Sequence, residues 1–167
     1  MQLNVSMNFD LGVDEVVELL ADEEFLQFKA DKSQTTLLAA DIMRHDDGAL
    51  TSAVRRTMSS DLIPQNLRSF VGNQLEVRQT EAWAEPDLSP GQRHGTFALE
   101  ITGAPVRISG NMVVRPTESG AVLEYTGDVV AAVPLFASMV ESAVGQAITQ
   151  VLESEQDFAL EWLANKG

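Results

Sequence analysis

Seven segments of this chain alternate apolar and polar residues, and that period of two is the pattern of strands that bury one face. The first segment shows it most clearly, with apolar residues at Leu3, Val5, Met7 and Phe9. The others are expected at residues 35–44, 50–58, 73–84, 93–102, 105–115 and 121–130. Because a parallel crossover needs about a dozen residues or more, the short connections between the last four force antiparallel pairing. The sequence therefore predicts a meandering antiparallel sheet.

Helical segments are expected in two places. Asp14 and Glu15 follow Gly12 and favour a helix start, and a second short helical piece has Phe25, Leu26 and Phe28 on its apolar side. From about Pro134 to the end, apolar pairs recur every four residues, and such a stripe drifts by about 40° per step around the helix. A helix of this kind has to be wrapped by its partner, which a curved sheet can do and a flat sheet cannot.

Size and composition limit the classes of function. The 167 residues fit one domain, 1–167, and the 25 acidic against 11 basic side chains give a net charge of −14. Nucleic acids and anionic membranes attract clustered Lys and Arg, so neither is an expected partner. There is no cysteine, which excludes thiolate chemistry, and no secretory signal or membrane-length apolar run is visible. We expect a cytoplasmic protein without membrane insertion.

Polar residues on an otherwise apolar strand face are the strongest indication of a site. Alternation puts Gln79 and Glu81 on the same face as Leu75, Val77 and Trp83. In segment 50–58 the same argument turns Arg56 inward, within diagonal reach of Gln79 if the two strands pair. These three polar side chains form the polar end of a pocket in one interpretation. In the other they sit at the rim, or Arg56 pairs with Glu81, and they merely close the interior.

No catalytic or metal-binding motif accompanies these residues. His45 and His94 fall in or beside predicted turns, no nucleophile motif or nucleotide-binding glycine pattern occurs, and we expect no metal and no cofactor. Tyr125, the only tyrosine, is expected to be a core ring whose hydroxyl reaches backbone or water. The candidate cavity-lining residues are Arg56, Met58, Val77, Gln79, Glu81, Trp83, Met112, Tyr125, Phe136, Met139, Val140 and Val144.

Several short segments add a resemblance to a known family. They are Arg55-Arg56-Thr57-Met58 followed by Ile63-Pro64, Phe70-Val71-Gly72 leading to Gln79-Thr80-Glu81-Ala82-Trp83, and Val133-Pro134-Leu135. These segments resemble an actinobacterial family catalogued as domain-of-unknown-function family 2505, within the START and birch-pollen-allergen (SRPBCC) superfamily. The resemblance implies an α+β helix-grip fold: a curved seven-stranded antiparallel sheet around a long C-terminal helix, with two short helices between strands 1 and 2. Members of that superfamily enclose a cavity between sheet and helix.

Three functions fit these observations. The leading hypothesis is non-catalytic binding of a hydrophobic or amphipathic small molecule that is lipid-, polyketide- or sterol-like. The second is an enzyme of the cyclase or dehydratase kind that uses Glu81 or Tyr125, which requires Glu81 to be buried in a deep pocket with a raised pKa. The third is a protein-interaction module without a ligand, whose interior is filled by its own side chains. The oligomeric state does not follow from the sequence.

Overall fold

The computed structural model describes residues 1–62, 65–70, 74–86 and 91–166. The order of elements is the expected one: β1 (Gln2–Phe9), α1 (Val13–Leu20), α2 (Glu23–Lys32), β2 (Thr36–Arg44), β3 (Leu50–Ser59), two 3-10 helices (Ser60–Leu62 and Gln65–Phe70), β4 (Gln74–Trp83), β5 (Arg93–Thr102), β6 (Val106–Pro116), β7 (Ala121–Ala131) and α3 (Ala137–Lys166). Four predicted features lie outside the described residues: the strand start at Asn73, Ile63-Pro64, residues 71–72, and residues 87–90 of the turn at 85–91.

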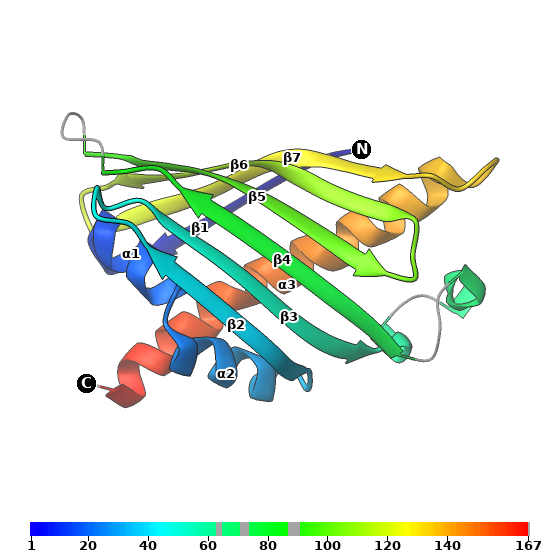
Figure 1. The fold of residues 1–167 in the computed structure, drawn as a ribbon, viewed down its shortest axis with the longest axis horizontal. Coiled ribbons are helices and arrows are strands. Elements are labelled where there is room, and N and C mark those ends of the chain that lie inside the picture. Colours follow the sequence, from blue (N-terminus) through cyan, green and yellow to red (C-terminus); the bar gives the residue numbers. More distant parts are fainter. Residues whose placement is uncertain (63–64, 71–73, 87–90, 167) are drawn as a thin grey trace.

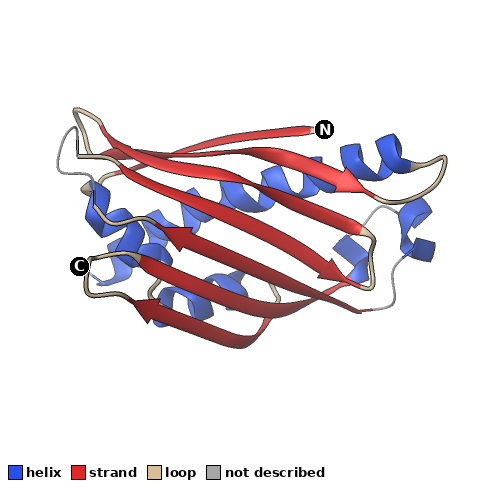
Figure 2. Ribbon diagram, turned by 45° about the horizontal axis from the view of Figure 1, so that its top comes forward, coloured by secondary structure: helices blue, strands red, loops and turns tan. Residues whose placement is uncertain are grey.

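The seven strands form one antiparallel sheet in the order β1-β7-β6-β5-β4-β3-β2. The sheet is curved and does not close, because β1 and β2 remain as its edges. In Figure 1, α3 runs diagonally behind the sheet, and Figure 2 shows α1, α2 and α3 all on that same side. The predicted α+β helix-grip architecture is therefore confirmed, with a helix-covered inner face and a bare outer face.

The alternation seen in the sequence corresponds to burial in strands such as β1 and β4, but in β2 no residue is fully buried and the register shifts between Leu37 and Ala39. In β1, buried and exposed residues alternate without exception. In β4, Leu75, Val77 and Trp83 are each buried on the inner face. Glu81 lies on that face too and is buried, so the inward direction predicted for it is confirmed.

The two short helices begin where the local sequence provides partners for their free backbone N–H groups. At α1, the backbone N–H of Gly12 donates to the Glu15 carboxylate over 3.1 Å. At α2, one carboxylate oxygen of Asp22 accepts from the backbone N–H groups of Glu24 and Phe25. The apolar residues of α1 then pack against β5 to β7, and those of α2 against β2 and α3.

The long helix α3 packs mainly on β1 and β7, and on α2. The sequence predicted one buried stripe from Leu135 onward, and for the first turn this is wrong. Leu135 is 98% exposed, and Phe136 and Met139 are 47% and 42% exposed. The reason is the connection after β7, in which Leu135 has a φ of 69° and the chain turns back beyond the end of the sheet (Figure 1). No helix in the described part of the chain is both long and apolar enough to cross a bilayer.

A close approach of β6 and β7 supplies a test of the fold. Gly110 and Gly127 are register partners, and a Cβ added to Gly110 would overlap the backbone of Thr126 and Gly127. We expect Gly110→Val to lower the free energy of unfolding by at least about 2 kcal/mol because the two strands must move apart. Ser109→Val, on the exposed side of the same strand, should change it by less than about 0.5 kcal/mol. Urea unfolding measures both, and equal effects would contradict the close approach.

Candidate functional site

A groove lies between α3 and the inner face of the sheet. Its volume is about 360 Å³, and most of the side chains along it are aliphatic. Those from the sheet include Met58, Leu75 and Val77, and those from α3 include Val144, Ala147 and Ile148. The groove exists because α3 packs on β1 and β7 at one side of the sheet and makes few contacts with β3 and β4 at the other.

Arg56 stands at the inner end of this groove. Its register partner is Val77, which places Gln79 at the diagonal position, as the sequence predicted. The side chain is half-buried, and it lines both the groove and a second, much smaller cavity of about 20 Å³. Gln79 and Glu81 line that small cavity. Arg56 therefore separates the apolar groove from a polar interior.

The polar interior is built around a buried ion pair between two helices. The ammonium of Lys29 in α2 lies 2.9 Å from Oε1 of Glu155 in α3, and both residues are less than 10% exposed. The ammonium also lies over the ring of Phe25, 5.1 Å from its centroid. Removal of two charges from water is costly, and this contact and the mutual attraction offset part of that cost.

Glu81 is the second buried carboxylate of the interior. Its Oε1 accepts hydrogen bonds from Gln79 Nε2 at 2.8 Å and from the Tyr125 hydroxyl at 3.3 Å. Burial raises the pKa of Glu81 above its ordinary value of 4.5, and the negative charge of Glu155 raises it further. Lys29 and hydrogen bonds from Gln79 and Trp83 act in the opposite direction without cancelling the shift.

Tyr125 is held as a hydrogen-bond donor. It is 1% exposed, and the ring of Phe97 meets it edge-on at a centroid distance of 5.1 Å. Burial, followed by the charge of Glu81, raises the pKa of the Tyr125 hydroxyl well above 10.0. The expectation of a core ring is correct, and its hydroxyl donates to the carboxylate of Glu81.

The structure divides the candidate residues into four groups. Arg56, Met58, Val77 and Val144 line the groove, and Gln79 and Glu81 line the small cavity with Arg56. The side chains packed into the core are Trp83, Met112, Tyr125 and Val140. Phe136 and Met139 point toward solvent, so their predicted place inside is wrong, because α3 begins beyond the end of the sheet. No ion pair joins Arg56 to Glu81 among the described residues.

Lys29 and Glu155 are the site residues that the sequence argument missed. The only indication in the sequence was the position of each residue within the apolar pattern of its helix. Lys29 follows Phe25 by four residues, on the apolar side of α2, and Glu155 falls where the apolar stripe of α3 is interrupted. Periodicity can show that a charged residue interrupts an apolar face, but it cannot show that two such residues meet.

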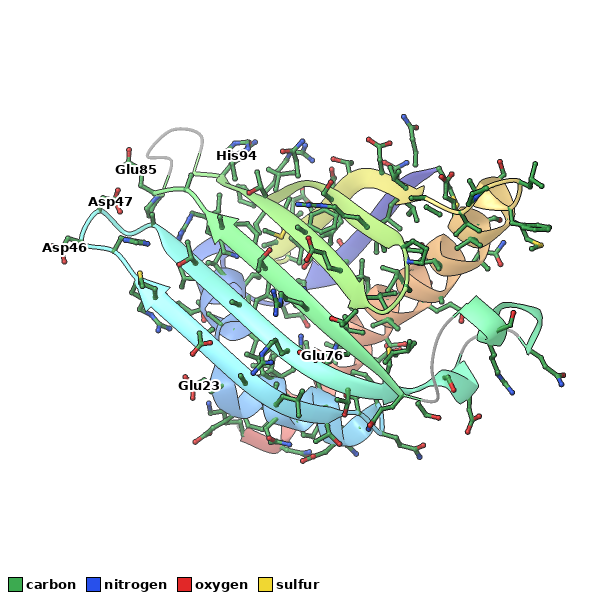
Figure 3. The ribbon with its side chains drawn as sticks, turned by 45° about the vertical axis from the view of Figure 1, so that its right-hand side comes forward. Glu23, Asp46, Asp47, Glu76, Glu85 and His94 are labelled. Carbon is green, nitrogen blue, oxygen red and sulfur yellow. The ribbon has the colours of Figure 1, made fainter. Side chains whose placement is uncertain are left out.

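The histidines lie away from this interior. His45 is exposed in the β2–β3 hairpin, and His94 is exposed near the start of β5. Figure 3 shows His94 and Glu85 at the same end of the sheet as the turn with Asp46 and Asp47. Within residues 1–62, 65–70, 74–86 and 91–166, no three His, Asp or Glu side chains gather as a metal site would require.

Comparison with known proteins assigns the chain to a family. The family model described as "Protein of unknown function (DUF2505)" matches residues 4–163. The chain belongs to the DUF2505 family. Among its relatives are the uncharacterized proteins Rv0481c of Mycobacterium tuberculosis (strain ATCC 25618 / H37Rv) and Mb0491c of Mycobacterium bovis (strain ATCC BAA-935 / AF2122/97). Each is 23% identical over 171 residues, covering 97% of this chain and 96% of the relative.

A solved structure shares the fold of this DUF2505 protein. The crystal structure of TTHA0849 from Thermus thermophilus superposes with a TM-score of 0.63 and 14% identity, over 100% of this chain and 99% of that one. At this identity the likeness concerns the fold alone.

The buried ion pair gives a prediction about stability. Lys29→Met leaves Glu155 buried without a partner, and we expect the free energy of unfolding to fall by about 3–5 kcal/mol. The double variant Lys29→Met/Glu155→Leu should recover most of that loss, because no buried charge remains. As a control, Lys32→Met breaks the exposed pair with Glu161 and should cost less than about 1 kcal/mol. A double variant no more stable than Lys29→Met would contradict this account.

The raised pKa of Glu81 gives a prediction about pH. Between the unfolded-state and folded-state pKa values, the folded chain holds a proton that the unfolded chain has released. The stability from this group is complete below the unfolded-state pKa and is lost as the pH rises through the folded-state pKa. We therefore expect wild-type stability to fall relative to Glu81→Gln as the pH rises from about 4.5 toward 8.

Urea unfolding of both proteins across this range measures the difference. Glu153→Gln, at an exposed position of α3, serves as the matched control and should follow the wild type. A difference between wild type and Glu81→Gln that does not change with pH would show that Glu81 has no raised pKa.

Proposed function

We propose that this DUF2505 protein binds a hydrophobic or amphipathic small molecule, lipid-, polyketide- or sterol-like, in the groove between α3 and the sheet. The observation that carries the proposal is the groove itself: about 360 Å³ of space with mainly aliphatic walls inside a folded chain. Small-molecule sites commonly measure about 300–1,000 Å³ and combine apolar walls with a few polar groups. Here Arg56 supplies such a group at one end.

The energetics of such binding follow from the walls. Transfer of apolar ligand surface from water to the groove is worth about 25 cal/mol per Å². Val144, Ala147 and Ile148 on α3 face the groove opposite Met58 and Val77 on the sheet, so a flat or extended apolar ligand contacts both walls. Binding of this kind needs no catalytic group and no cofactor.

The proposal also includes the wider relationship of the chain. We place the DUF2505 protein in the START and birch-pollen-allergen superfamily, as one domain spanning 1–167 that acts in the cytoplasm. The curved sheet with a long C-terminal helix supports this placement, as does the groove where that superfamily encloses its cavity. The net charge of −14 argues against nucleic acid as the partner.

An enzyme of the cyclase or dehydratase kind is the second candidate. The raised pKa of Glu81 and its hydrogen bond with Tyr125 favour it, because a carboxyl group with a raised pKa keeps its proton to higher pH than an ordinary one and is better suited to act as a general acid. However, the enclosed space that Glu81 lines is a cavity of about 20 Å³, roughly that of one water molecule; Glu81 also borders the open hollow on the outer face, but it does not line the groove. Binding without catalysis therefore agrees better with the geometry.

A protein-interaction module is the third candidate. The exposed Leu135, Phe136 and Met139 at the start of α3 form an apolar tip that favours it. This hypothesis requires an interior filled by the protein's own side chains. The groove is not filled in this way, which favours ligand binding instead.

The outer face of the sheet is a weaker ligand site. It carries a depression of about 940 Å³ over β2 to β6, bordered by small side chains such as Thr80, Ala82 and Thr96. This hollow is open to water, so a ligand there would bury only one side. Apolar binding gains more free energy in the groove, where two walls exclude water.

Groove binding can be tested with N-phenyl-1-naphthylamine, a neutral probe that fluoresces in apolar surroundings. We expect the wild type to bind the probe. Val144→Trp, which fills the groove, should weaken binding by about tenfold or more. Gln146→Trp places the same ring on the exposed side of α3 and should bind like the wild type. Equal binding by all three proteins would remove the groove as the site. Native mass spectrometry of the purified protein would identify any ligand that co-purifies.

A further inference from the structure

The positive charges of this protein are almost all neutralised. In the described part of the chain, each lysine and arginine except Arg56 and Arg78 forms an ion pair with a carboxylate. Arg78 is exposed to water. Arg56 is therefore the one inward-facing cation without an ion pair among these residues, in a chain with more than twice as many acidic as basic side chains.

The neighbouring arginine shows the contrast most directly. Arg55 and Arg56 are adjacent in β3 and point to opposite faces of the sheet. On the outer face Arg55 pairs with Glu76 at 3.0 Å, and Glu76 is labelled on that face in Figure 3. On the inner face Arg56 lies beside Val54 and Met58 and opposite Val77. Polar side chains, among them Gln79 and Glu81, also lie near this half-buried guanidinium, but no ion pair compensates its charge in the described part of the chain, and partial removal of an unpaired charge from water is costly.

The polar groups near Arg56 are already engaged elsewhere. Lys29 and Glu81 line the small cavity with Arg56. Lys29 is paired with Glu155, and Glu81 accepts from Gln79 and Tyr125. The hydroxyl of Ser154, which lines the groove, donates to the backbone carbonyl of Gln150. None of these groups offsets the charge of Arg56, so the inner end of the groove presents one positive charge to whatever occupies it.

We infer that the ligand is an amphipathic monoanion, a carboxylic acid whose carboxylate binds Arg56 and whose apolar part lies along the groove against α3. This inference rests on the proposed function and specifies its ligand class. The planar guanidinium matches a carboxylate through two parallel hydrogen bonds. One negative charge balances one arginine, whereas a phosphomonoester with nearly two would leave excess negative charge inside an already acidic protein.

Two probes that share one ring system test the charge. 1-Anilinonaphthalene-8-sulfonate is N-phenyl-1-naphthylamine with an added sulfonate, which stays ionised at every working pH. We expect Arg56→Gln to weaken the sulfonated probe by about tenfold or more and to leave the neutral probe within about twofold of the wild type. Arg56→Lys should retain part of the affinity for the sulfonated probe, because the charge remains.

Arg55→Gln is the matched control. It removes the same charge from the same strand but from the outer face, so binding of both probes should be unchanged. If Arg55→Gln and Arg56→Gln weaken binding of the sulfonated probe equally, the change in net charge explains the effect, and the inference is overturned. Unchanged binding of this probe by Arg56→Gln would overturn it as well, while the proposed function would stand on the response of the neutral probe to Val144→Trp.

The kind of head group is tested by displacement of the neutral probe with decanoate, decyl phosphate and decanol. We expect decanoate to compete best with the wild type and to fall to the level of decanol with Arg56→Gln. Tighter competition by decyl phosphate, or equal competition by decanol and decanoate, would show that the ligand class is wrong. If Val144→Trp binds the neutral probe as tightly as the wild type does, the proposed function is wrong, and the inference that rests on it is wrong too.

Discussion

The structure depends on the burial of one face of a seven-stranded sheet by three helices on the same side. The strands other than β2 bury apolar side chains on that side, and the helices cover it unequally. α3 packs on β1 and β7, α1 lies over β5 to β7, and α2 lies next to β2. Because α3 packs on β1 and β7, the region between α3 and β3 to β5 is only partly filled. The groove is a consequence of this uneven cover.

The charged residues of the interior differ in how far they are buried, and each deals with the cost of a buried charge in its own way. Deep between α2 and α3, Lys29 and Glu155 neutralise each other, and burial raises the pKa of Glu81, which favours its uncharged form to higher pH than usual. Arg56 stands nearer to the groove, is half-buried and lacks an ion pair in the described part of the chain. A side chain that keeps its charge at all relevant pH values cannot reduce the cost of burial by releasing a proton. An anionic ligand would remove that cost, which links ligand binding to the stability of this end of the sheet.

Membership of the DUF2505 family and the likeness to TTHA0849 establish the fold, but they assign no activity. With 14% identity, this chain and TTHA0849 share few side chains although their folds are alike. Function on such a scaffold is decided by the few polar groups inside, since these can change without loss of the fold. In this chain the polar groups of the interior are Arg56, the residues around Glu81 and the pair of Lys29 with Glu155.

The sequence by itself determined the strands, their antiparallel pairing and the inward direction of Arg56, Gln79 and Glu81. These properties depend on alternation and on short connections, which are local in the chain. Only the tertiary structure decided that Lys29 meets Glu155, 126 residues away, and that Tyr125 donates to Glu81. It also decided that Phe136 and Met139 stay exposed, because the covered part of α3 depends on where the sheet ends. A periodic pattern shows which side of an element is apolar, and the partner of that side is set by how the elements pack.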